Sequence, residues 1–156
     1  MHIDPGENER DHAHDEHDAQ ALRYRHQIGP RAEAVREHAS AAMDVSDGLA
    51  GDLAKLCGVS DVSATIDLGS IPLSDAAQGL VSRGVVAVET LIAGGDDYEI
   101  LCTMSEDRIE AFTRAALAVG VAVRSIGTVV AGNQAPTFID RQGREVALER
   151  LSYSHF

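Results

Sequence analysis

The sequence has no tryptophan, a single lysine and two cysteines, and its acidic residues outnumber its basic ones by 25 to 13. The net charge is -12, and the basic residues form no stripe along the sequence. Nucleic-acid binding through phosphate neutralisation is therefore not expected. Cys57 and Cys102 match no metal or redox spacing. We therefore expect both to be small buried side chains in a reducing compartment, the cytoplasm.

Two further absences narrow the class of protein. No apolar run is long enough to span a bilayer, and the polar N-terminus is unlike a signal peptide, so no membrane contact is expected. The phosphate-binding pattern G-x-x-x-x-G-K-[ST] is also missing, which argues against a self-contained nucleotide site of the usual type. An acidic protein that handles phosphates would then need a cation to mediate the contact.

The chain divides into a tail and one domain. Residues 1–20 hold seven acidic residues, one basic residue and almost no apolar ones, so we expect a disordered tail. Its histidines His12, His14 and His17 could hold a divalent metal loosely. A solvated tail is the preferred interpretation, because nothing there fixes ligand geometry. Residues 21–156 are long enough to bury the core of one domain.

Hydrophobic periodicity predicts helices and strands that alternate along the domain. We expect helices over residues 31–38, 47–57, 75–81, 86–93 and 105–120. Strands are expected over residues 62–67, 98–103, 121–130 (interrupted at Gly127), 137–140 and 144–148. Runs of two strands between helices favour a mixed sheet covered by helices, of the α/β or α+β class.

The stretch A-M-D-V-S-D-G-L-A-G-D, from Ala42 to Asp52, is rich in acidic side chains where a short apolar segment meets a helix. Ser46 is predicted to cap that helix, with Asp47 in its first turn complementing the helix dipole. Gly48 would leave the first turn open to close approach by another group. Capping does not account for Asp44, and two carboxylates three residues apart also suit Mg²⁺. Both interpretations stay open on the residues alone.

A second acidic stretch, G-G-D-D-Y-E-I, covers residues 94–100. One interpretation is a left-handed glycine that ends a helix, followed by aspartates in a turn. The other is a ligand or metal site, because neighbouring carboxylates repel one another unless something offsets their charge. The aromatic finish S-Y-S-H-F likewise has two interpretations, since it could dock into the core or flank a ring-shaped ligand.

Five ordered motifs together resemble the thiamine-phosphate kinase family. They are A-M-D-V-S-D-G-L-A-G-D-L, I-D-L-x-x-I-P-L-S, G-G-D-D-Y-E-I-L, S-I-G-T-V-V and the terminal S-Y-S-H-F. That family is part of a superfamily with aminoimidazole ribonucleotide synthetase, selenophosphate synthetase and the hydrogenase-maturation protein HypE. The resemblance covers residues 22–156 and the family's C-terminal half only. The N-terminal half, with most nucleotide and metal ligands and the main dimer contacts, has no counterpart in this sequence.

The resemblance implies a role for several residues of these motifs. Asp44 and Asp47 resemble Mg²⁺ ligands, and Ser46 resembles a contact to the ATP phosphates. Asp96 resembles the residue that recognises the aminopyrimidine of thiamine phosphate, at a position where many members carry glutamate. Either Tyr153 or Phe156 resembles the aromatic residue that packs on the substrate ring.

The family reaction transfers the γ-phosphoryl group of ATP to thiamine phosphate, giving thiamine diphosphate. Such a transfer needs positioning and charge neutralisation, which acidic residues holding Mg²⁺ supply. We expect little activity from this chain without an N-terminal domain or a homodimer partner, and exposed apolar surface where that half docks. The alternative is a non-catalytic remnant that binds thiamine phosphate or a full-length partner.

Overall fold

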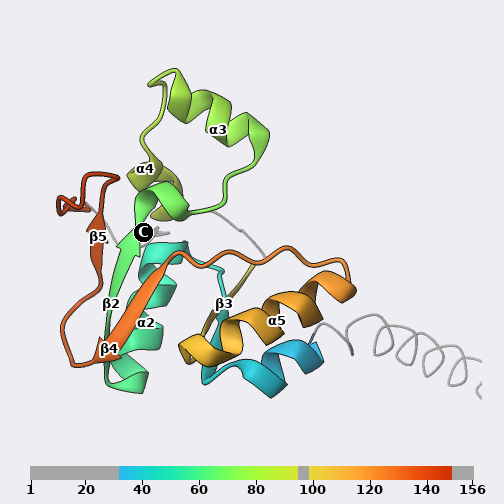
Figure 1. Cartoon of the computed structure of the whole chain (residues 1–156). Coiled ribbons are helices and arrows are strands. Elements are labelled where there is room, and N and C mark those ends of the chain that lie inside the picture. Colours follow the sequence, from blue (N-terminus) through green and yellow to red (C-terminus); the bar gives the residue numbers. More distant parts are fainter. Residues whose placement is uncertain (1–31, 95–98, 149–156) are drawn as a thin grey trace, which may run out of the picture.

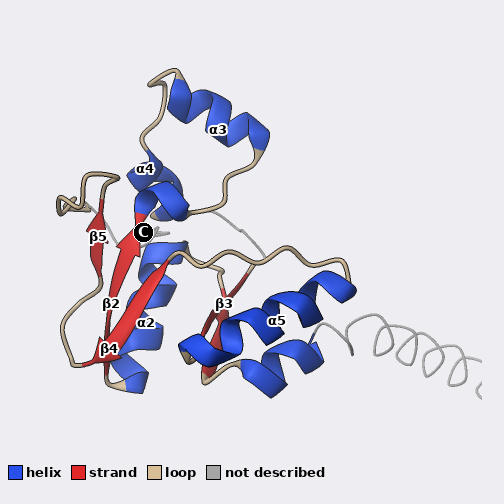
Figure 2. Cartoon of the chain, in the orientation of Figure 1, coloured by secondary structure: helices blue, strands red, loops and turns tan. Residues whose placement is uncertain are grey.

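The computed structural model describes residues 32–94 and 99–148. The elements are a helix over residues 32–38, then β1 (Ala41–Asp44), α2 (Leu49–Ser60), β2 (Val62–Asp67), a short 3-10 helix η1 (Leu68–Ser70), α3 (Asp75–Ser82), α4 (Val88–Ile92), β3 (Ile100–Thr103), α5 (Glu106–Ala118), β4 (Gly127–Ala131) and β5 (Thr137–Ile139). The tail predicted to be disordered, residues 1–20, lies outside the described residues. Figure 2 shows how these helices and strands alternate along the chain.

The strands form two small sheets. β1 and β3 pair antiparallel, with Asp44 opposite Ile100 and Ala41 opposite Thr103. In the second sheet β2 is the central strand, antiparallel to β4 and parallel to β5. The second sheet is therefore mixed, and helices cover both sheets (Figure 1). The predicted mixed α/β architecture is confirmed.

Helix α2 joins the two sheets through one hydrophobic core. Its buried face carries Leu53, Leu56 and Cys57, and the helix contacts both β1 and β2. The core also includes Val45 and Leu101 beside the first sheet, and Ala64, Ile66 and Phe138 from the second. Because α2 serves both sheets, a shift of this helix would disturb the β1–β3 pair and the β2 sheet together.

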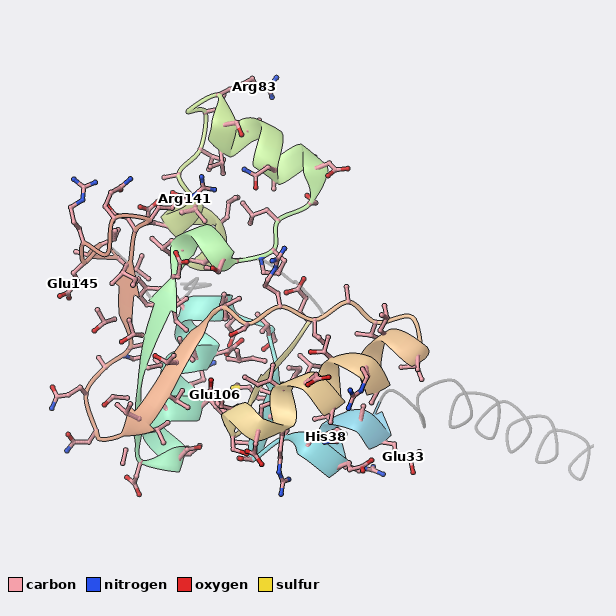
Figure 3. The ribbon with its side chains drawn as sticks, in the orientation of Figure 1. Glu33, His38, Arg83, Glu106, Arg141 and Glu145 are labelled. Carbon is pink, nitrogen blue, oxygen red and sulfur yellow. The ribbon has the colours of Figure 1, made fainter. Side chains whose placement is uncertain are left out.

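The remaining helices lie around this centre. The helix over residues 32–38 packs on α5, where the rings of His38 and Phe112 meet edge to face with centroids 6.2 Å apart. Figure 3 shows His38 between these two helices. By contrast α3 has no buried residue and projects from one end of the molecule (Figure 1). None of the described helices has the length and apolar character needed to cross a membrane.

Several sequence expectations are confirmed. Ser74 is the N-cap of α3, its hydroxyl oxygen accepting the amide of Ala77 at 3.3 Å. The strand expected over residues 62–67 is β2. The helix expected over residues 105–120 is α5, which ends at Ala118, and Gly120 after it has a φ of 73°. Cys57 is buried as expected, and Cys102 is partly buried, both as free thiols.

Other boundaries were wrong, for reasons visible in the pairing. Residues 121–126 form no strand, because pairing with β2 begins only at Gly127. Residues 144–148 contribute a single bridge, between Glu145 and Ile139. There Asp140 Oδ1 accepts the amides of Gln142 and Arg144, which closes a tight turn in place of a strand. In α5, the hydrophobic periodicity of the sequence would place Ile109 on the inner face with Phe112 and Ala116, but Ile109 is 38% exposed.

Gly127 marks the start of the β2–β4 pairing, and a side chain there would not fit. A Cβ atom would meet the carbonyl oxygen of Thr65 and, at 2.8 Å, the side chain of Ile66. We expect Gly127→Ala to lower the free energy of unfolding by about 1–3 kcal/mol, the usual cost of overpacking. Urea denaturation followed by circular dichroism measures this loss.

The control for this substitution is Gly58→Ala, in α2, where a Cβ would have nothing within 4 Å. Alanine at an exposed helix position is expected to stabilise by about 0.5–1 kcal/mol. An equal loss in both variants would show that the close approach of β2 to Gly127 does not limit the side chain.

Candidate functional site

The predicted acidic site lies on the turn between β1 and α2. Asp44 is exposed at the end of β1, Ser46 is exposed, and the Asp47 side chain is 49% exposed. Val45, between them, is buried in the core. The apolar residue thus anchors the turn while the polar side chains on either side of it remain at the surface, where they can meet a ligand.

The turn is not capped as the sequence predicted. Helix α2 begins at Leu49 rather than Asp47, its N-cap is Gly48, and no side chain makes a capping hydrogen bond there. The prediction that Ser46 caps the helix was therefore wrong. The physical reason is Asp52, whose carboxylate Oδ2 accepts the backbone amides of Ser46 at 2.7 Å and Asp47 at 3.0 Å.

Asp52 is the one fully buried charged side chain among the described residues. Its Oδ1 accepts from Lys55 Nζ at 2.9 Å, and the same ammonium donates to Asp47 Oδ2, also at 2.9 Å. A buried charge is tolerated only when it is paired and hydrogen-bonded, and these donors meet that requirement. Asp52, Lys55 and Asp47 thus form one connected group around the turn.

These contacts set the electrostatics of the group. Burial raises the pKa of Asp52, but hydrogen bonds from Lys55 and from the amides of Asp47 and Ser46 outweigh it, so its pKa lies below the ordinary 3.8. Hydrogen bonds to Asp47 and Asp52 raise the pKa of Lys55 above its ordinary 10.5. At neutral pH Asp52 is therefore ionised and Lys55 is protonated.

Sequence analysis assigned no role to Asp52 or Lys55. A signal was present, because Leu49, Leu53 and Leu56 define the buried face of α2 and position 52 completes the i, i+3, i+4, i+7 pattern of that face. An aspartate on a buried face requires partners, and the single lysine of the chain follows three residues later. The pattern predicts burial, whereas the bonds to the turn amides require the structure.

The second acidic stretch runs beside this turn at both of its described ends. At its start, the backbone of Ala93 and Gly94 lies against Gly48. Near its end, the carbonyl oxygen of Glu99 accepts the amide of Val45 at 2.9 Å. Asp96 lies outside the described residues, within the segment 95–98 that links these two points. The two acidic motifs, 50 residues apart in sequence, thus meet around one turn.

Other expectations on the second stretch have different outcomes. The left-handed glycine expected at the end of α4 was wrong for Gly94, because α4 ends at Ile92 and its C-cap Ala93 has φ -88°. The aromatic residues Tyr153 and Phe156 lie outside the described residues. Their proposed contact with a substrate ring stays a prediction.

The donors on the turn suit a hard cation. Asp44, at the end of β1, and Asp47 are both exposed, and Ser46, which lies between them in the sequence, is exposed as well. Within residues 32–94 and 99–148 no group of three or more His, Cys, Asp or Glu side chains is placed to hold a metal. Mg²⁺ commonly takes only one or two carboxylates and completes its shell with water and substrate phosphates. The residues present fit that mode of binding.

Comparisons with known proteins give a consistent result. Residues 1–138 match the family model of AIR synthase related protein, C-terminal domain. The thiamine-monophosphate kinase of Caulobacter vibrioides is 40% identical over 144 residues, which are 88% of this chain and 40% of the relative. That of Escherichia coli K12 is 38% identical over 149 residues, 91% of this chain and 44% of the relative. The chain thus spans less than half the length of these curated relatives.

Solved structures agree. The thiamine-monophosphate kinase of Stenotrophomonas maltophilia has a TM-score of 0.60 and 36% identity over 67% of this chain and 32% of that one. A ThiL protein complexed with AMPPCP and TMP has a TM-score of 0.63 and 28% identity over 88% of this chain and 41% of that one. The hydrogenase maturation protein HypE of E. coli, 14% identical with a TM-score of 0.63, shares the fold.

Gly48 tests the contact between the two acidic motifs. Its φ of 101° disfavours any side chain, and a Cβ would lie 2.7 Å from the amide nitrogen of Gly94. We expect Gly48→Ala to lower the free energy of unfolding by more than the roughly 1–3 kcal/mol of the backbone strain alone. Gly84→Ala is the control, because Gly84 also has a positive φ but has nothing within 4 Å of a Cβ. Equal losses, measured by urea denaturation, would contradict the contact.

Asp52 is expected to make stability depend on pH. Because its folded pKa lies below the ordinary 3.8, its contribution is present above about pH 4 and is lost as the pH falls through the folded pKa. At pH 7 we expect Asp52→Asn to cost about 3 kcal/mol, the usual size for breaking a buried pair. The difference between wild type and variant should shrink below pH 4 in urea denaturation.

Asp140→Asn is the matched control for this experiment. Asp140 also accepts two backbone amides and pairs with Arg144, but its side chain is 24% exposed. An exposed pair of this kind contributes about 1 kcal/mol or less. A difference between wild type and Asp52→Asn that grows below pH 4 would contradict the role given to the buried carboxylate.

Proposed function

Because the chain belongs to the AIR synthase related protein family, as a C-terminal domain of that family, we propose that it is the C-terminal part of a thiamine-phosphate kinase. The proposed reaction transfers the γ-phosphoryl group of ATP to thiamine phosphate and gives thiamine diphosphate. The observation that carries the proposal is the exposed pair Asp44 and Asp47 on a turn of fixed backbone. The names of the matched curated relatives agree with it.

Asp44 and Asp47 are proposed to hold Mg²⁺, with the Ser46 hydroxyl contacting the ATP phosphates. A bound Mg²⁺ neutralises phosphate charge, which is the main requirement of phosphoryl transfer. The chain's own contribution is to present oxygen ligands on a turn that does not have to be ordered when the ligand arrives. Its net charge of -12 makes such a cation necessary for any contact with polyphosphate.

Thiamine phosphate is proposed to bind next to this turn. Asp96 would accept hydrogen bonds from the aminopyrimidine, and Tyr153 or Phe156 would pack on the substrate ring. The support for Asp96 is that the described ends of its segment, Gly94 and Glu99, both lie against the turn that carries Asp47. The relative complexed with AMPPCP and TMP, whose fold this chain shares, is in keeping with this pair of ligands.

Activity is proposed to require more protein than this chain. The chain spans 40% and 44% of two curated kinases, and two carboxylates are only part of a metal site. The further part would be an N-terminal domain or a homodimer partner. We propose that the protein acts in the cytoplasm. Strand β4 offers one edge for such a partner, since all five of its residues are exposed, with Val130 at 64%.

A chimera tests this proposal. The chain alone, with ATP, Mg²⁺ and thiamine phosphate, is expected to form no thiamine diphosphate above background. Fused to the N-terminal part of the Caulobacter vibrioides kinase, it is expected to turn over, and Asp47→Asn should lower the rate by about 100-fold or more, as loss of a metal ligand does. Asp140→Asn is the control, expected to stay within about twofold of wild type.

Two outcomes of the chimera experiment would count against the proposal. Turnover by the chain alone at the rate of the chimera would show that no further domain is needed. A folded chimera that binds neither nucleotide nor thiamine phosphate would remove the kinase assignment.

The alternative is a binding module without catalysis, which would bind thiamine phosphate or a full-length partner. Calorimetric titration with thiamine phosphate separates the two. Binding that weakens in Asp96→Ala, combined with an inactive chimera, would support the module. An active chimera would exclude it.

A further inference from the structure

The stretch from the end of β1 to the first turn of α2 contains three aspartates in two kinds of environment. Asp44 and Asp47 are exposed, whereas Asp52 is fully buried and has both oxygens occupied. A fully buried carboxylate whose two oxygens already accept two backbone amides and an ammonium is not presented to a metal ion at the surface. Asp52 therefore influences ligand binding through the residues that it holds, which are Ser46, Asp47 and Lys55.

We propose that Asp52 is a positioning residue, which fixes the backbone of Ser46 and Asp47 so that the Asp47 carboxylate is presented to a divalent cation, and that Lys55 holds that carboxylate until the cation replaces it. The proposal deepens the function proposed above and rests on it, because it takes Asp47 as a metal ligand. In the metal-free protein, the Lys55 ammonium then serves as the counter-ion of the Asp47 carboxylate.

The backbone half of the proposal follows from the hydrogen bonds. The amides of Ser46 and Asp47 precede α2, whose N-cap is Gly48, and take no part in the backbone hydrogen bonds of that helix. Asp52 Oδ2 binds both of them from within the first turn of that helix. Rotation of either peptide would leave a buried carboxylate without its donors, which is costly. The Cα–Cβ direction of Asp47 is thereby fixed by a rigid element.

The lysine half follows from charge and exposure. Lys55 Nζ lies 2.9 Å from both carboxylates, and its side chain is 54% exposed. An ion pair between side chains that are about half exposed contributes little to stability, so a divalent cation can displace Lys55 from Asp47. Lys55 keeps its bond to Asp52 when it releases Asp47, so the buried carboxylate remains paired throughout.

The experiment uses the whole 156-residue chain and Mn²⁺ alone as the probe. Free Mn²⁺ is measured by electron paramagnetic resonance, and exchange of the Ser46 and Asp47 amides is followed by NMR. Asp47→Asn is measured first and is expected to weaken Mn²⁺ binding. Asp52→Asn is expected to speed exchange of both amides about tenfold or more and to weaken Mn²⁺ binding about tenfold or more, as loss of an outer-shell partner does.

Two further variants complete the design. Asp140→Asn removes a carboxylate with similar backbone bonds in another turn, and it is expected to leave both measurements unchanged. Lys55→Met is expected to keep the two amides protected and to strengthen Mn²⁺ binding about fivefold, because one competing positive charge is removed. Because Asp52 keeps the backbone amides of Ser46 and Asp47 as donors when Lys55 is replaced, this variant carries the test should Asp52→Asn fail to fold.

The outcomes separate this proposal from the one on which it rests. If Asp47→Asn leaves Mn²⁺ affinity unchanged, the proposed metal site is lost, and the role of Asp52 with it. If Asp47→Asn weakens binding while Asp52→Asn binds as wild type, the metal site stands and the positioning role is overturned. Weaker Mn²⁺ binding in Lys55→Met, or faster exchange of the two amides there, would likewise overturn it.

Discussion

The buried carboxylate of Asp52 is the constraint on which the acidic turn depends. Burying a charge on the core face of α2 is unfavourable unless several donors reach it. The donors are two backbone amides of the turn and the ammonium of Lys55. Meeting the needs of this one group therefore dictates the path of the chain before the helix, and it moves the start of α2 from the predicted Asp47 to Leu49.

The same turn explains how two motifs distant in sequence come together. Val45 is held on one side by the core and by the carbonyl of Glu99. Gly48, three residues later, lets the backbone at Gly94 approach more closely than a side chain would allow. The described residues that flank segment 95–98 on the two sides, Gly94 and Glu99, therefore both contact this turn.

The sequence predicts the positions of most helices and strands better than the contacts between residues that are distant along the chain. The apolar periodicity of α2 and of β2, and the serine Ser74 before α3, are local signals. Local signals of this kind located most helices and strands. The sequence did not predict that Asp52 would replace a Ser46 cap, because this depends on a side chain six residues away that accepts the amides of Ser46 and Asp47. Strand limits at residues 121–126 and 144–148 failed likewise, since pairing depends on a partner strand and not on composition.

Burial decides what each acidic residue of the turn can do. A carboxylate enclosed with three donors is a structural anchor, whereas the exposed Asp44 and Asp47 keep lone pairs that face solvent. Counting Asp52, the turn has three negative charges within nine residues and one lysine to balance them. The excess repels itself less in water than it would around a desolvated phosphate, so binding an anion there without a cation would be unfavourable. A bound cation would offset this excess of negative charge, which is in keeping with the metal–phosphate complex proposed above.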